Sequence, residues 1–124
     1  MRPLAVLRWL PALLWMGWIF WLSSQTALPP PPGISYTRAA LAGHFALYAA
    51  LTCLLLIAVG SPRGASPQLT AALLIAIGYA LSDELHQSFV PGRDAALEDL
   101  LVDALGVLFA SIVWVCGWRK IATS

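Results

Sequence analysis

All six carboxylate side chains of this 124-residue chain lie within 21 consecutive residues, from Asp83 to Asp103. The remainder is strongly apolar, since 60% of all residues are hydrophobic and only 10% are charged. Soluble domains carry roughly 25% charged residues. The chain therefore lacks the polar surface of a soluble globule. We expect the lipid bilayer to be its solvent and the acidic stretch to lie at one edge of the membrane.

Charge and cysteine content exclude several classes of protein. The net charge of +1 gives no basic field for nucleic acid, so no nucleic-acid partner is expected. Cys53 and Cys116 lie inside apolar runs and form no CxxC pair, which favours packing over a disulfide framework or a zinc knuckle. The length allows one domain, spanning residues 1–124.

The apolar segments predict an all-α membrane protein built as a bundle of four transmembrane helices. Their expected bounds are about 4–23, 38–60, 67–87 and 97–118. About 20 residues at ~1.5 Å each match a hydrocarbon core of ~30 Å. The first segment has Arg2 and Arg8 as a basic flank, so a cleaved signal peptide is an alternative for it. Pro29 to Pro32 predict an extended loop after it, or a polyproline ligand for a partner domain.

Segment length places acidic residues inside the last two helices. The apolar run 69–81 has only 13 residues, so the third helix must continue through Asp83, Glu84 and His86 to cross a bilayer. The run 104–118 has 15 residues, so the fourth helix begins near Leu97 and includes Asp99 and Asp103. These carboxylates are expected at or below the membrane interface.

The basic residues predict the orientation. With a cytoplasmic N-terminus, five basic residues lie inside and only Arg38 and Arg93 lie outside. The inner five are Arg2, Arg8, Arg63, Arg119 and Lys120. An arrangement with both termini inside is therefore favoured. It places the proline loop, the 89–96 turn and the polar ends of three helices on the outer side.

Helical phase directs these polar groups inward. At about 100° per residue, Asp83 and Gln87 continue a stripe of alanines with the spacing that allows close helix approach. That stripe is Ala72, Ala76 and Ala80, and the fourth helix aligns Asp99, Asp103, Gly106 and Ala110 in the same way. His44 and Tyr48 share one face of the second helix. Glu84 and His86 flank Asp83 about 160° apart, so a regular helix cannot aim both at one centre.

The runs SDELHQSFVPGRDAALEDLLVDALG and HFALYAAL resemble the VanZ-like family of bacterial membrane proteins, named for an accessory protein of teicoplanin resistance. The resemblance covers nearly the whole chain and implies a small helical bundle in the bacterial cytoplasmic membrane. It also implies an outer-edge polar site drawn from His44, Tyr48, Asp83, Glu84, His86, Gln87, Arg93 and Asp99, to which helical phase adds Asp103. Two positions depart from the family: Leu41 replaces a frequent lysine, and Asp103 a frequent asparagine.

Four functions fit such a cluster. Binding of a lipid-linked or cell-wall-related ligand would use Arg93 for a phosphate or carboxylate and the acids for hydroxyls or amines, in glycopeptide-resistance physiology. A structural network would pair Arg93 with a carboxylate of the third or fourth helix and His44 with another. A membrane-embedded hydrolase or transferase would hold a divalent metal through His44, Asp83, His86 and Asp99. Proton-linked transport would require self-association, so further copies of the chain are partners to consider.

Overall fold

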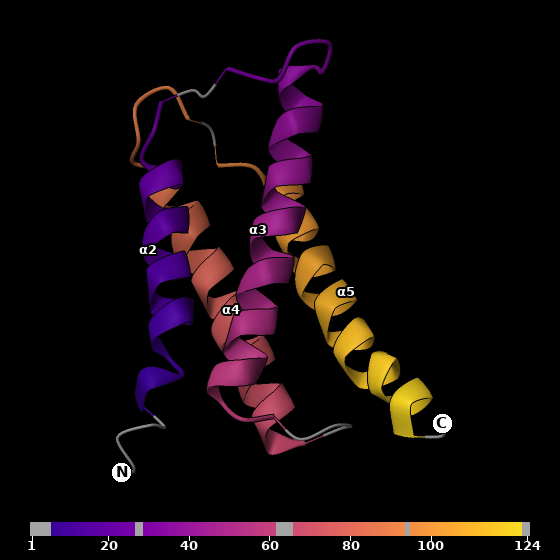
Figure 1. Ribbon diagram of the computed structural model, residues 1–124. Helices are drawn as coiled ribbons and strands as arrows, with labels where there is room; N and C mark the ends of the chain where they lie inside the picture. The colour runs from indigo at the N-terminus through magenta and orange to yellow at the C-terminus, as the bar shows by residue number, and fades with distance from the viewer. Residues whose placement is uncertain (1–5, 27–28, 62–65, 94, 123–124) are drawn as a thin grey trace.

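The protein is an up-and-down helical bundle. The computed structural model describes residues 6–26, 29–61, 66–93 and 95–122, with side chains described as far as Cys116. Four helices follow one another: α2 (Leu10–Ser23), α3 (Tyr36–Ala58), α4 (Pro67–Gln87) and α5 (Leu97–Ala122). The connections after α2 and α4 meet at one end of the bundle, at the top of Figure 1, and we call this the proline-loop end. The all-α, four-helix prediction is confirmed.

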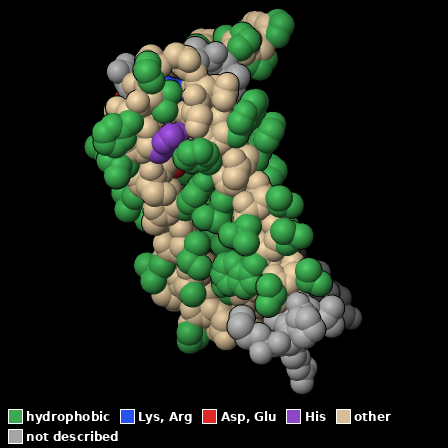
Figure 2. All heavy atoms as spheres, turned by 90° about the vertical axis from the view of Figure 1, so that its left-hand side faces the viewer, with side chains coloured by type: hydrophobic (Ala, Val, Ile, Leu, Met, Phe, Trp, Pro, Cys, Tyr) green, Lys and Arg blue, Asp and Glu red, His purple; other side chains and the backbone are tan. Residues whose placement is uncertain are grey.

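Three helices are long and apolar enough to cross a membrane. They are α3 with 23 residues, α4 with 21, and the Leu97–Cys116 part of α5 with 20. Figure 2 shows hydrophobic side chains along the length of one face of the bundle, with very few charged groups among the described residues. A surface of this kind is stable against lipid tails and not against water. The prediction of a membrane protein is therefore confirmed.

The first helix begins later than predicted. Val6 and Leu7 are helical, but a turn at Arg8 and Trp9 separates them from α2, which starts at Leu10. Pro11 lies in the first turn of α2, where its missing N–H needs no partner. Further into a helix, a proline would clash with the carbonyl four residues earlier, so the regular helix restarts here. At 14 residues, α2 is about 21 Å long. Residues 1–5 lie outside the described residues.

Although short, α2 is an integral part of the bundle. Its Ala12 and Ile19 are fully buried. Trp15 Nε1 donates to the carbonyl of Leu47 on α3 at 3.0 Å, and the Tyr79 hydroxyl of α4 donates to the carbonyl of Met16 at 2.6 Å. A polar group that finds a partner inside an apolar environment avoids a large desolvation cost. These contacts favour a retained helix over a cleaved signal peptide.

Helix ends follow from local chemistry. Ser66 accepts from the Leu69 backbone N–H at 3.1 Å, and Pro67 follows it at the first helical position of α4. Ser35 caps α3 in the same way. Gly60, with φ of +64°, ends α3 in the left-handed conformation that favours glycine. Capping thus sets where α3 begins and ends.

Small residues bring the helices together. The predicted alanine stripe of α4, from Ala72 to Ala80, is completely buried. On α5, a Cβ added at Gly106 would lie only 2.5 Å from the carbonyl oxygen of Phe45. The backbones of α3 and α5 therefore approach closely at this glycine, as helices packed in a bilayer commonly do. This approach positions α5 so that its polar first turns face α3.

Candidate functional site

His44 lies between two carboxylates of α5. Its Nδ1 is 2.9 Å from Asp103 Oδ1, and its Nε2 is 3.7 Å from Asp99 Oδ2. Asp99 and Asp103 are one helical turn apart, so both reach the same imidazole. Asp103 is 1% exposed and His44 is 9% exposed, which makes this a buried link between α3 and α5. A carboxylate on one ring nitrogen fixes the orientation of the imidazole and can stabilise its protonated form.

A second polar group joins α2, α3 and α4. Asp83 Oδ2 accepts from the Tyr48 hydroxyl at 3.3 Å and from Gln87 Nε2 at 3.2 Å. The same Gln87 nitrogen is 3.4 Å from Ser23 Oγ of α2. The predicted inward phase of Tyr48, Asp83 and Gln87 agrees with these contacts. All three side chains are buried, in line with the alanine stripe below them.

Two acceptor atoms of this second polar group lack hydrogen-bond partners among the described residues. Asp83 Oδ1 and Gln87 Oε1 are buried, yet neither has a hydrogen-bond partner among the described residues. Asp83 is 4% exposed and Gln87 is 1% exposed. Leaving a buried acceptor unpaired costs about 1–3 kcal/mol, and more for a charged one. The two acceptors lie on adjacent turns of one helix, so a donor that reached both would offset this cost.

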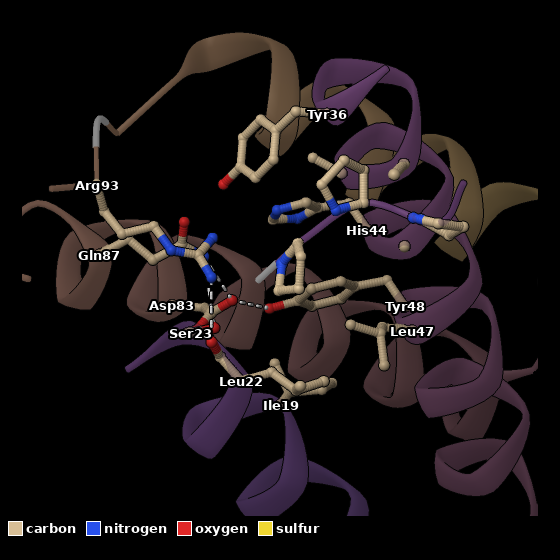
Figure 3. A pocket seen from close by; sticks show the side chains of 16 residues that line it. Ile19, Leu22, Ser23, Tyr36, His44, Leu47, Tyr48, Asp83, Gln87 and Arg93 are labelled. Carbon is tan, nitrogen blue, oxygen red and sulfur yellow. Dashed lines mark hydrogen bonds between the residues drawn. The ribbon is translucent and has the colours of Figure 1, made fainter. Parts of the chain in front are cut away.

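A cavity of about 250 Å³ lies between α2 and α3, and Asp83 and Gln87 are part of its lining. In Figure 3, Arg93, Gln87 and Asp83 lie on one side of it and His44 and Tyr48 on the other. The complete lining is Ile19, Leu22, Ser23, Pro29, Pro30, Pro31, Tyr36, Ala39, Ala40, Gly43, His44, Leu47, Tyr48, Asp83, Gln87 and Arg93. Most of this wall is apolar, while the polar groups converge on one region. That combination is typical of ligand sites.

Arg93 is anchored differently from the prediction. Its Nε donates to the carbonyl of Gln25 at 2.8 Å, and its NH2 group donates to the carbonyl of Leu22 at 3.1 Å. It forms no ion pair with any carboxylate among the described residues, so the predicted pairing with helix three or four is wrong. The turn before Arg93 carries it over the end of α2, where the helix dipole favours a cation.

Glu84 and His86 point away from each other, as helical phase predicts. Glu84 Oε1 accepts from the backbone N–H of Ala96 at the start of α5, where the helix dipole favours a negative charge. His86 Nε2 is 3.0 Å from Ser24 Oγ, and its ring stacks on Phe20 with centroids 4.4 Å apart. Both residues therefore join neighbouring helices and do not line the cavity.

The four candidate metal ligands are divided between separate contacts. His44 and Asp99 meet at the α3–α5 contact, Asp83 bonds to Tyr48 and Gln87, and His86 contacts α2. Within the described ranges, no three His, Cys, Asp or Glu side chains are placed to share a metal ion. The exposed Glu98 lies at the surface, and Asp94 lies outside the described residues.

Sequence reasoning did not identify several cavity residues. Ser23 is the last residue of the first predicted helix, and Tyr36 precedes the second predicted helix. Gly43 is the most informative omission: a Cβ there would meet nothing within 4 Å, because the cavity is beside it. A glycine directly before the helix-two histidine was the only available signal for it.

The comparisons with known proteins agree with this architecture. Neither the curated proteins nor the solved structures include a significant match to the chain. The sequence model of the VanZ/LLP1 family, however, matches residues 8–119. That range contains all four described helices except the last residues of α5, and every residue of the site. The chain therefore belongs to the VanZ/LLP1 family.

Proposed function

We propose that this membrane protein binds a lipid-linked or cell-wall-related ligand in the cavity beside Asp83, and that it thereby protects the cell envelope against glycopeptides such as teicoplanin. The observation that carries the proposal is the pair of buried, unpartnered acceptors on Asp83 and Gln87, both of which line a cavity. Membership of a family named for teicoplanin resistance supports the physiological role.

The two polar groups of the site support different roles. His44 and Asp103 pair with each other at 2.9 Å and link two helices, as a structural network would. Asp83 and Gln87, which line the cavity, each leave one buried acceptor without a partner among the described residues. A network selected only for stability would close this space or satisfy these atoms, because unpaired buried acceptors destabilise the fold. We therefore assign the scaffold role to the first pair and ligand binding to the second.

The basic residues support placing the site at the outer face of the bacterial cytoplasmic membrane. Five of seven flank the end opposite the proline loop in the four-span arrangement. The proline-loop end, with the cavity, then faces outward. Envelope precursors and their lipid carriers are accessible from that leaflet, so a ligand would reach the cavity without crossing the bilayer.

The test uses growth of a teicoplanin-susceptible strain that expresses the protein, beside thermal melts of the purified chain. Asp83→Asn keeps the shape of the side chain and removes its charge. Gly43→Leu fills the cavity without meeting another residue at its Cβ. Gly78→Leu is the matched control, because a Cβ at Gly78 also meets nothing and Gly78 is exposed outside the cavity.

We expect the parent and Gly78→Leu to raise the inhibitory concentration of teicoplanin. Asp83→Asn and Gly43→Leu should lose this protection while their melting temperatures stay close to that of the parent. If protection and melting temperature fall together in Asp83→Asn, the cluster holds the bundle together and the binding role is wrong. If neither variant loses protection, the cavity is not the functional site.

A further inference from the structure

We infer that the cavity takes the head group of a phospholipid with a primary amine, a phosphoethanolamine lipid, with its ammonium at Asp83 and its phosphate at Arg93. The inference rests on the proposed function, because it names the ligand of the same cavity. It follows from three features of the lining: an unpaired anionic acceptor, a partly unused guanidinium, and an apolar wall beside both.

The part of the cavity lined by Asp83 and Gln87 suits a cationic hydrogen-bond donor. Asp83 is buried and has no basic partner among the described residues, and its Oδ1 accepts nothing. Gln87 Oε1, one helical turn away, is also unpartnered. A hydroxyl offers one donor and no charge, whereas an –NH₃⁺ group offers three donors and the opposite charge. A primary ammonium therefore satisfies both acceptors and neutralises the carboxylate.

The part of the cavity lined by Arg93 suits a phosphate. Arg93 uses Nε and one NH2 hydrogen to hold the end of α2, so its second terminal nitrogen makes no hydrogen bond to a described residue. A guanidinium fixed in this way keeps its charge and its remaining N–H groups for a phosphate oxygen. Arg93 and Asp83 line the same cavity (Figure 3), so one zwitterion can contact both.

Size and wall chemistry favour a lipid head group over a larger ligand. Sites for drug-sized molecules are roughly 300–1,000 Å³. A cavity of about 250 Å³ is too small for a glycopeptide or for a complete lipid, but it accommodates a head group. Ile19, Leu22 and Leu47 continue the lining with hydrocarbon, and they lie on the helices that face the bilayer. The acyl chains of a bound lipid could therefore remain in the membrane.

This chemistry discriminates between two lipids of equal charge. A choline head group carries a quaternary ammonium, which has no N–H to donate to Asp83 or Gln87. The amine should therefore be preferred by about tenfold or more, since hydrogen bonds to charged groups are worth about 1.5–3 kcal/mol. A glycerol head group donates hydroxyls but supplies no cation, so it should also bind more weakly.

The experiment measures lipid binding to the purified full chain in lipid-free detergent by native mass spectrometry. Phosphatidylethanolamine, phosphatidylcholine and phosphatidylglycerol with identical acyl chains are titrated separately, beside soluble O-phosphoethanolamine. Parent and Gly78→Leu should prefer the ethanolamine lipid by about tenfold or more. Gly43→Leu should lose binding, and Asp83→Asn and Gln87→Met should bind ethanolamine and choline lipids equally.

The outcomes separate this inference from the function on which it rests. Equal binding of ethanolamine and choline lipids by the parent overturns the inference, even if Gly43→Leu abolishes protection from teicoplanin. Tight binding of soluble O-phosphoethanolamine, equal to that of the lipid, overturns the assignment to a membrane lipid. A strong ethanolamine preference that Gly43→Leu removes, with protection unchanged, supports the inference and contradicts the resistance role.

Discussion

Replacing Gly106 with alanine is expected to separate α3 from α5 and to break the link between His44 and Asp103. A Cβ at position 106 would lie 2.5 Å from the carbonyl oxygen of Phe45 and 3.1 Å from the backbone nitrogen of Ala49. These are backbone atoms of a regular helix, so no side-chain rotation relieves the contact. Ordinary contact begins near 3.4 Å, so the two helices must move apart by about 0.9 Å.

This separation reaches the site because Asp103 is three residues before Gly106. If α5 moves as a rigid body, the 2.9 Å contact between His44 and Asp103 lengthens to about 3.8 Å, which is too long for a hydrogen bond. Overpacking costs about 1–3 kcal/mol, and loss of a hydrogen bond to a charged group costs about 1.5–3 kcal/mol. The free energy of unfolding should therefore fall by about 3–5 kcal/mol.

The assay is thermal unfolding of purified protein in one detergent, with Gly78→Ala as the matched control. A Cβ at Gly78 meets nothing, so that variant should melt within a few degrees of the parent. Gly106→Ala should melt lower by on the order of 10 °C. In an Asp103→Asn background the same glycine change should cost less, because the charged link is already weakened. If both alanine variants melt together, the helices do not approach closely at Gly106 and the reasoning fails.

The other predictions concern neighbouring contacts and the orientation. Arg93→Ala should lower stability in lipid-free detergent by about 1–3 kcal/mol, because the end of α2 loses two hydrogen bonds, and Arg93→Lys should restore only part of it. Equal melting of all three proteins would contradict this anchor. His86→Ala should destabilise by about 1–2 kcal/mol through loss of its α2 contacts, measured by the same melt. In a cysteine-free background, a cysteine at Ala95 should react with an impermeant thiol reagent on intact cells, and one at Gln68 should not. The reverse labelling pattern would show the opposite orientation.

The sequence predicts the structure best where the bilayer imposes simple rules. Apolar length predicted three helices to within about two residues at most described ends, and it predicted that α4 continues through Asp83 and that α5 starts at Leu97. Helical phase correctly placed Asp83 and Gln87 in line with buried alanines. These results follow because a span must be about 20 residues long and every backbone group in it must be bonded.

The predictions were wrong for the partner of Arg93, where several neighbours were available, and for the start of the first helix. Charge alone suggested that Arg93 would pair with an acid, but the turn after α4 carries it to the carbonyls of Leu22 and Gln25 at the end of α2. The first helix starts at Leu10, although the apolar run begins earlier, because Pro11 favours the first turn of a helix. Sequence spacing does not specify which of several neighbours lies nearest, because loop paths decide it.

By itself, the sequence determined the class of protein, the helices that carry the polar residues and the faces on which they lie, since hydrophobic length and helical period are local properties. Only the tertiary structure decided which polar groups meet. It paired His44 with Asp103 across the close approach at Gly106, and it left buried acceptors of Asp83 and Gln87 unpaired in residues that line a cavity. The physical reason is that a cavity depends on how helices distant in sequence pack together, and no single segment encodes the space between them.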